Sequence, residues 1–161
     1  MTGISDVIQV MGAMVIFSLI LLNVNRFILN NQSTQVQSEL EYTGIAEGQN
    51  IIDEARILPF DKATSGGNTP TSVPGDFTSC GPGYGETKPS DFNDFDDYDG
   101  YAVTDTTEHG LYNISVNVCY VQSTNYNSCT SFKTTHKRML VKVASPYLDN
   151  PIKLSFIKSY Y

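Results

Sequence analysis

The sequence predicts an α+β fold, in which one long N-terminal α-helix packs on a small antiparallel β-sheet. Three features of the 161-residue chain support this prediction. Residues 1–25 are almost continuously apolar, residues 26–58 keep a helical pattern with one apolar stripe, and the C-terminal part alternates as strands do. The chain therefore divides into an apolar half-helix (1–25), an amphipathic half-helix (26–58) and a loop-rich β-domain (59–161).

The apolar half-helix is long enough to span a membrane. Between Val7 and Leu22 only Gln9 and Ser18 are polar, and this run alone gives about 24 Å of helix at ~1.5 Å per residue. The weakly polar flanks extend it to the ~30 Å of a hydrocarbon core. A cleaved secretory signal carries positive charge before its apolar run, whereas this segment carries Asp6 there. We therefore expect the helix to be retained in the mature protein.

The helix is expected to continue through the polar residues to Leu58. There is no proline before Pro59, which ends the helix because proline lacks an N–H donor and clashes with the preceding turn. Gly44 and Gly48 provide for a bend or for the close approach of a neighbouring element. One stripe recurs at three- and four-residue steps and predicts the face that packs on the sheet: Val36, Leu40, Gly44, Glu47, Ile51, Ala55 and Leu58.

Three segments beyond residue 110 alternate as half-buried strands do, and they predict a sheet of three or four antiparallel strands. Their inward residues are Tyr112, Ile114, Val116, Val118 and Tyr120, then Met139, Val141 and Val143, then Ile152, Leu154 and Phe156. The intervening residues 60–101 are rich in glycine and proline and have little periodicity. We expect them to form a long loop laid over the sheet.

The composition argues against two classes of function. The net charge of −7 is unsuited to nucleic acid, because binding phosphates requires a basic face. His109 and His136 lie far apart without a carboxylate at catalytic or ligand spacing, and the sequence has neither a nucleophile motif nor a phosphate-binding glycine loop. We therefore expect no nucleic-acid partner and no enzymatic activity.

The acidic stretch DFNDFDDYDGY, residues 91–101, allows three interpretations. It fits the EF-hand pattern poorly, but an irregular loop could bind a structural calcium ion through Asp94, Asp96, Asp97 and Asp99. Alternatively, it forms a solvated acidic turn whose aromatic residues dip into the sheet: Phe92, Phe95, Tyr98 and Tyr101. A catalytic acid cluster is the third interpretation, and no base or nucleophile supports it. Calcium is the one cofactor that the sequence suggests.

The order of an acidic residue near the N-terminus, an apolar half-helix, an amphipathic half-helix and a β-rich C-terminal part resembles type IV pilins and pseudopilins. The segments IIDEARILPFDKAT, FDDYDGY, VASPYL and PIKLSFIKSY are also similar to prepilin-type proteins encoded with pilus-biogenesis clusters in several Gram-negative bacteria. The resemblance implies a pilin-like fold, removal of a short basic leader, residence in the inner membrane, and assembly into a filament.

The resemblance also implies roles for two residues near the N-terminus. In the family, a glutamate at the fifth mature position neutralises the N-terminal amine of a neighbouring subunit. Here Ser5 is at that position and Asp6 supplies the acid, so we expect Asp6 to pair with the amine of a neighbouring Met1. We expect either that Met1 is the mature N-terminus or that a leader has already been removed.

The three cysteines indicate one disulfide and one remaining thiol in an oxidising compartment. By analogy with the C-terminal disulfide loops of pilins, Cys119 is expected to bond to Cys129, while Cys80–Cys119, Cys80–Cys129 and free thiols remain alternatives. A loop of this length gives about 2 to 3 kcal/mol in the chain-entropy account.

Two classes of function follow. The first is a structural subunit of an extracellular pilus-like filament, whose partners are copies of itself, the inner membrane and the pilus assembly machinery. Within this class, a minor pseudopilin of a type II secretion or pilus-assembly system is the alternative. The second class is a membrane-tethered binding protein with a single helix and a sugar- or metal-binding domain.

Overall fold

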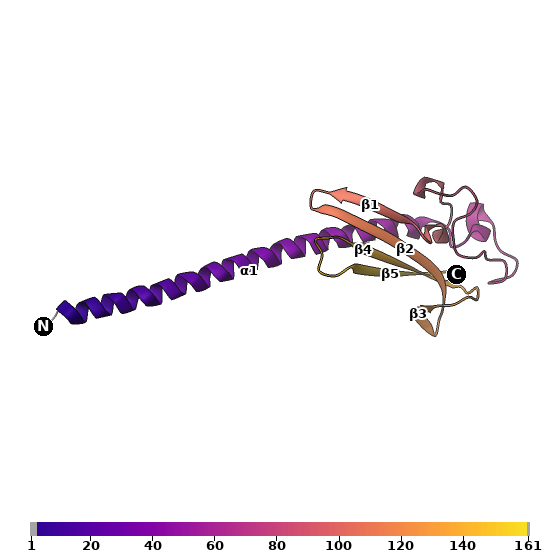
Figure 1. Cartoon of the computed structure of the whole chain (residues 1–161). Coiled ribbons are helices and arrows are strands. Elements are labelled where there is room, and N and C mark those ends of the chain that lie inside the picture. Colours follow the sequence, from indigo (N-terminus) through magenta and orange to yellow (C-terminus); the bar gives the residue numbers. More distant parts are fainter. Residues whose placement is uncertain (1–2, 161) are drawn as a thin grey trace. The chain divides into compact units, whose positions relative to one another are not determined.

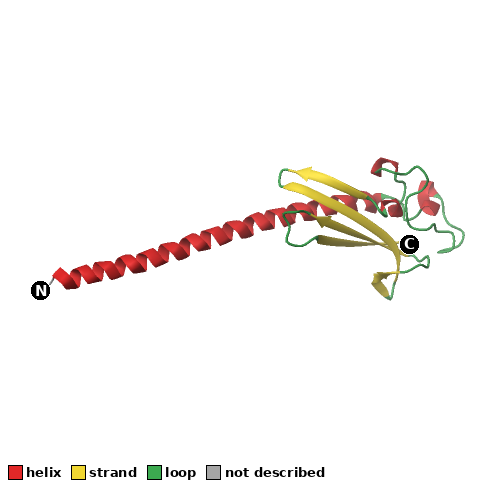
Figure 2. Cartoon of the chain, viewed as in Figure 1, coloured by secondary structure: helices red, strands yellow, loops and turns green. Residues whose placement is uncertain are grey.

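The computed structural model describes residues 3–160, which form one helix, three short 3-10 helices and five strands. The long helix α1 runs from Gly3 to Ile57 and ends one residue before the predicted end, ahead of Pro59. The chain divides into two compact units, Met1–Glu39 and Leu40–Tyr161, and each is described by itself. The first unit is entirely helical over its described residues. Figures 1 and 2 show the elements in chain order and by type.

The second unit is built on an antiparallel sheet of five strands, one or two more than the sequence predicted. The strands are β1 Ala102–Thr107, β2 Gly110–Gln122, β3 Asn125–Cys129, β4 His136–Ala144 and β5 Ile152–Ser159. Their order is β1-β2-β4-β5, and the short β3 pairs with the end of β2 beyond the main ladder. The sequence missed β1 and β3 because both are largely exposed and lack apolar alternation.

The sheet buries one face, and the predicted alternation is confirmed there. Val118 of β2 stands opposite Met139 of β4, which in turn stands opposite Phe156 of β5. All five predicted inward residues of β2 are buried, as are the three of β4, whereas those of β5 are half-buried. The main core comprises the inward residues of β2 up to Val118 and those of β4, with Ile52, Ala55 and the aromatic residues Phe92, Phe95 and Tyr98, and the β5 residues pack against it. Tyr120 lies in a second buried cluster with Phe60 and Phe77.

Residues 40–57 of α1 lie along the buried face of the sheet (Figure 1). Within this segment Gly44, Gly48, Ile52 and Ala55 are buried, at steps of four, four and three residues along one face of the helix. The predicted stripe is confirmed from residue 40 onward, whereas Val36 is exposed. Packing of one helix face on one sheet face is the expected arrangement for an α+β domain.

The two glycines permit close contact between α1 and β5. A Cβ atom at Gly44 would lie 2.7 Å from Cδ1 of Ile152, and one at Gly48 would lie 2.7 Å from Cδ1 of Leu154. Either distance is too short for two carbon atoms. The absence of side chains on α1 therefore makes room for the aliphatic side chains of β5, which settles the expectation of a close neighbour at these positions.

The segment between the helix and β1 is an ordered loop with short 3-10 turns. These are η1 Lys62–Gly67, η2 Pro89–Asp91 and η3 Phe95–Tyr98. The backbone N–H of Phe95 donates to the carbonyl of Pro59 at 2.9 Å, so the acidic stretch lies against the end of α1. The prediction of a long loop is confirmed, with local turns that the sequence did not indicate; the loop lies by the end of α1, at one end of the sheet (Figure 1).

Replacing Gly48 with leucine should destabilise the second unit. The new side chain collides with Leu154 and Val143, which costs about 1–3 kcal/mol and exceeds the ~1 kcal/mol gain in helix propensity. Thermal unfolding of the full chain in detergent, followed by near-ultraviolet circular dichroism, measures the effect. Asn50→Leu, at an exposed position of the same helix, is the control. Equal melting temperatures for both variants would refute the close packing at Gly48.

Candidate functional site

The first candidate site is the apolar surface of residues 4–29 of α1. Its large apolar side chains are exposed on every face, with Phe27 67% and Leu21 49% accessible. By length and composition this is the one helix in the described part of the chain that could cross a membrane. Monomeric soluble proteins rarely expose so large a continuous apolar surface, because burying it releases free energy. The segment therefore requires lipid or other apolar helices around it.

Two polar side chains within this segment, Ser18 and Asn23, form hydrogen bonds with the helix itself. The hydroxyl of Ser18 donates to the carbonyl of Met14 at 2.8 Å, and the amide Nδ2 of Asn23 donates to the carbonyl of Leu19 at 2.9 Å. Such bonds satisfy polar groups that would otherwise be costly in an apolar medium. Ser18 and Asn23 are thus compatible with burial in a membrane or in a helix bundle.

Asp6 is one of two charged side chains in this segment, the other being Arg26. It lies in the first turn of α1 and is the one acidic or basic side chain before Arg26. A carboxylate in the first turn interacts favourably with the positive end of the helix dipole. Its expected partner, the amine of Met1, lies outside the described residues. The pairing of Asp6 therefore stays a prediction.

The second candidate site is the acidic stretch, whose four candidate ligands each have separate interactions within the protein. Asp94 Oδ1 accepts from the N–H of Asp96, and Asp97 Oδ2 accepts from the N–H groups of Asn93 and Asp94, so both carboxylates cap η3. Asp99 Oδ1 accepts from the N–H of Val118 at 2.7 Å and from the amide of Asn117 at 2.9 Å, which ties the loop to β2.

The geometry does not support the calcium hypothesis. Among residues 3–160, the structure contains no group of three or more histidine, cysteine, aspartate or glutamate side chains arranged to hold a metal ion. Asp94 and Asp97 accept from backbone N–H groups of the turn, Asp96 contacts Lys137, and Asp99 accepts from residues of β2. Calcium binding by these aspartates therefore stays a prediction from their density in the sequence.

The solvated-turn interpretation is correct for the aromatic residues and for the exposed Asp91, and wrong for three of the five aspartates. Phe95 and Tyr98 are fully buried, and Phe92 stacks edge-on against Tyr98 with ring centroids 4.8 Å apart. However, Asp94, Asp96 and Asp97 are also buried, with at most 2% of each accessible. Buried carboxylates need compensating donors or charges, and these come from an unexpected residue of β4.

That residue is Lys137, which is completely buried. Its Nζ donates to Asp61 Oδ2 at 2.7 Å and to the carbonyl of Phe60 at 3.0 Å, and it also contacts Asp96 Oδ1. The rings of Phe60 and Tyr120 lie 4.7 and 4.9 Å from Nζ, within the range of cation–π attraction. Lys137 thus joins three segments: the residues just after α1, the acidic stretch, and the sheet.

Asp61 is held as an anion by several donors. Besides Lys137, the N–H of Ala63 donates to Oδ1 at 3.0 Å, and the N–H of Thr78 lies 3.0 Å from Oδ2. The hydroxyl of Tyr120 lies 3.1 Å from Oδ2. Burial alone would raise the pKa of Asp61, but the Lys137 charge and these hydrogen bonds outweigh it and hold the pKa below the usual value.

The other carboxylates of the cluster shift in the opposite direction. Burial raises the pKa of Asp94 to about 7, with the neighbouring charge of Asp96 as the second cause. Burial also raises the pKa of Asp96, although Lys137 opposes the shift. Oδ2 of Asp96 is buried without a hydrogen-bond partner. The cluster, defined as Asp61, Asp94, Asp96 and Lys137, therefore combines one stabilised anion with two carboxyls inclined to hold a proton.

The sequence contained a signal for Lys137 that the prediction did not use. In HKRMLVKVA, Lys137 alternates with Met139, Val141 and Val143, so it occupies an inward position of the strand. A lysine in the apolar phase of a strand requires a buried anion, and the acidic stretch is rich in candidates. Asp61 could not have been found this way because only the folded loop brings it to β4.

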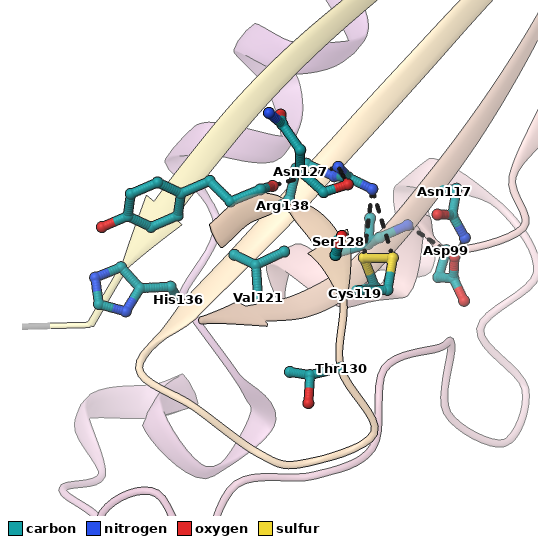
Figure 3. Close-up of a disulfide and its surroundings, with 12 residues drawn as sticks. Asp99, Asn117, Cys119, Val121, Asn127, Ser128, Thr130, His136 and Arg138 are labelled. Carbon is teal, nitrogen blue, oxygen red and sulfur yellow. Dashed lines mark hydrogen bonds between the residues drawn. A yellow bond between two sulfur atoms is a disulfide. The ribbon is translucent and has the colours of Figure 1, made fainter. Parts of the chain in front are cut away.

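The disulfide joins Cys119 to Cys129, as the family analogy implied, and it closes the hairpin of β2 and β3. Figure 3 shows the guanidinium of Arg138 beside the bond, with Nη2 3.5 Å from Sγ of Cys129 and Nη1 3.3 Å from the carbonyl of Tyr126. The third cysteine, Cys80, is a free thiol. Burial, then the charge of Asp96, raises its pKa to about 12, so Cys80 is a poor nucleophile at neutral pH.

Comparison of this chain with protein-family models, with curated proteins and with solved structures finds no match. What the structure itself supports is a pilin-like architecture: an apolar N-terminal helix, an antiparallel sheet packed on residues 40–57, and a C-terminal disulfide. The helix is suited to membrane anchoring or export, and the disulfide indicates a location outside the cytoplasm.

Replacing Lys137 with methionine should cost about 3–5 kcal/mol of unfolding free energy, because Asp61 and Asp96 lose their compensating charge while remaining buried. Denaturant titration of the full chain measures the loss. Lys142→Met, at an exposed position of the same strand, should change stability by less than about 0.5 kcal/mol. A similar small change for both variants would show that the buried ion pairs contribute little.

Replacing Asp94 with asparagine should alter the pH dependence of stability. The folded protein holds a proton on Asp94 up to about pH 7, whereas the unfolded chain releases it near 3.8, so this group destabilises the fold progressively as pH rises between those values. Asparagine can still cap η3 but does not titrate. The stability of the variant relative to wild type should therefore increase from pH 4 to pH 7. A difference that stays constant across this range would contradict the shifted pKa.

Proposed function

We propose that this protein is a structural subunit of an extracellular type IV pilus-like filament. The observation that carries the proposal is the continuous apolar surface of residues 4–29, which is exposed on all sides, in a chain whose second unit has pilin-like architecture. A structural role, rather than an enzymatic one, accounts for both. The carboxylate cluster, which is the main concentration of titratable groups, is closed to substrates because it is buried.

Assembly would proceed by helix bundling. Before assembly, the inner membrane hides the apolar half-helix, whose backbone hydrogen bonds are all internal, as a membrane segment requires. Once extracted, the same surface can be hidden from water only against equivalent helices of other copies. The partners in this scheme are copies of the chain, the inner membrane and the pilus assembly machinery, with the second unit on the surface of the filament.

Asp6 would supply the charge complement in the filament core. An isolated carboxylate among apolar helices is costly, so Asp6 would seek the N-terminal amine of a neighbouring copy. This gives each added subunit a directional contact that the apolar surface alone does not provide. Asp6 stands at position six rather than five, and the pairing requires the amine to reach this position.

Microscopy of fibres sheared from cells that produce this chain, with mass spectrometry of their main protein, tests the proposal. The chain should be the predominant component of the fibres. A chain confined to trace amounts would point instead to a minor pseudopilin of a pilus or type II secretion system. Retention of all the protein in the membrane, monomeric in detergent, would overturn filament assembly and favour a tethered binding protein.

Asp6→Ala should abolish fibre formation while leaving membrane insertion intact, because the apolar run is unchanged and only the charge pairing is lost. Fibre yield after shearing and the amount of protein in the membrane fraction are the two measurements. Asp149→Ala, at an exposed position of the second unit, serves as the control and should assemble normally. A normal fibre yield from Asp6→Ala would eliminate charge pairing and leave the helix dipole as the sole role of Asp6.

A further inference from the structure

We propose that Lys137 and Asp96 form an intramolecular isopeptide bond, so that the mature β-domain is covalently closed between the acidic stretch and β4. The inference rests on the arrangement of the buried cluster and does not depend on filament assembly. A primary amine, a carboxyl carbon and two further carboxyl groups meet there in a site from which water is excluded.

The reacting groups are already in contact. Nζ of Lys137 contacts Oδ1 of Asp96, so Nζ lies one bond away from contact with the carboxyl carbon Cγ. Both side chains are at most 1% accessible. Anchoring is provided by Asp61 Oδ2 and the carbonyl of Phe60, which hold Nζ at 2.7 and 3.0 Å. Intramolecular groups fixed in this way react as if at very high concentration, since the entropy of encounter has been lost on folding.

The site also favours the protonation states that amide formation needs. A lysine ammonium and a carboxylate do not condense, whereas a neutral amine and a neutral carboxylic acid can. Passing the proton from Lys137 to Asp96 turns this ion pair into two neutral groups. Asp61 stays ionised and keeps its other donors, the N–H groups of Ala63 and Thr78 and the hydroxyl of Tyr120. The aromatic rings of Phe60 and Tyr120 line this site, and burial raises the pKa of Asp96 in the direction the transfer requires.

The bond-forming step uses the two other carboxyls. The lone pair of Lys137 Nζ attacks Cγ of Asp96, and a proton from nitrogen passes to Asp61 Oδ2, which remains an ionised acceptor. Asp94, whose pKa is near 7, supplies a neutral acid beside Asp96, where Oδ2 lacks a donor. The carbon–oxygen bond then breaks, the proton on Asp61 returns to the departing hydroxyl, and water leaves. An amide forms without any oxidant, reductant or cofactor.

Mass spectrometry of the purified full chain tests the bond directly. After reduction of the disulfide, the intact mass should be lower than the sequence mass by one water molecule. Tryptic digestion should yield residues 63–133 joined to residues 134–138, because trypsin does not cleave between Lys88 and Pro89 and cannot cleave after Lys137 once its amine is acylated. Fragmentation should place the link between Asp96 and Lys137. A full sequence mass for the folded wild-type protein overturns the proposal.

Two variants and one competing reaction sharpen the result. Lys137→Met should show the full mass, whereas Lys142→Met should still lack one water. Asp61→Asn should slow bond formation during refolding by about a hundredfold or more, as expected for loss of a positioned proton acceptor. Dehydration at Asp99–Gly100 to a cyclic imide gives the same mass loss but leaves residues 63–133 unlinked, and that outcome also overturns the proposal.

Discussion

The buried amine of Lys137 is the contact on which the organisation of the β-domain depends. The loop between α1 and β1 has little hydrophobic periodicity, so burial of apolar residues alone gives it few reasons to adopt one path. Lys137 fixes that path at two points, Asp61 and Asp96, which lie at opposite ends of the loop. Asp99, through the backbone of Val118, adds a third point. The aromatic residues of the acidic stretch then pack into the core because their backbone is already held against the sheet.

The described part of α1 illustrates how one secondary structure can meet two different requirements. Within the second unit, the helix gives up side-chain volume at Gly44 and Gly48 so that Ile152 and Leu154 can approach its backbone. Within the first unit, the side chains are large and apolar on every face, and Ser18 turns its polar atom back onto the helix. A helix face with glycines fits one specific neighbouring element, here β5. A helix that is apolar on every face fits lipid or several identical helices. A filament subunit needs both.

Features that depend on local hydrophobic periodicity were predicted well from the sequence. Features that depend on contacts between side chains from distant parts of the chain were predicted poorly. The helix end at Pro59, the inward residues of β2 and β4, and the aromatic residues of the acidic stretch follow from local patterns that each element carries by itself. The fate of the aspartates does not, because it is decided by Lys137, forty-one residues away from Asp96 in the chain. Net charge and density suggested a metal, yet the compensating cation was a side chain already present in the strand. The exposed strand β1 was missed for a related reason: its place is set by pairing with β2 rather than by its own residues.

Two different kinds of interaction hold neighbouring segments at the start of β4: buried ion pairs on one face of the sheet and a disulfide-bonded hairpin on the other. Because neighbouring residues of a strand point to opposite faces, Lys137 points inward to the carboxylates while Arg138 points outward to the disulfide hairpin. The outward fixation relies on a bond that reductants cleave, and the inward one relies on a cluster that reductants do not affect. If Lys137 and Asp96 are joined, the inward fixation becomes covalent as well, and tension applied along β4 would be transmitted to the loop without rupture of an ion pair. A domain held this way would keep its loop in place in conditions where its disulfide is reduced.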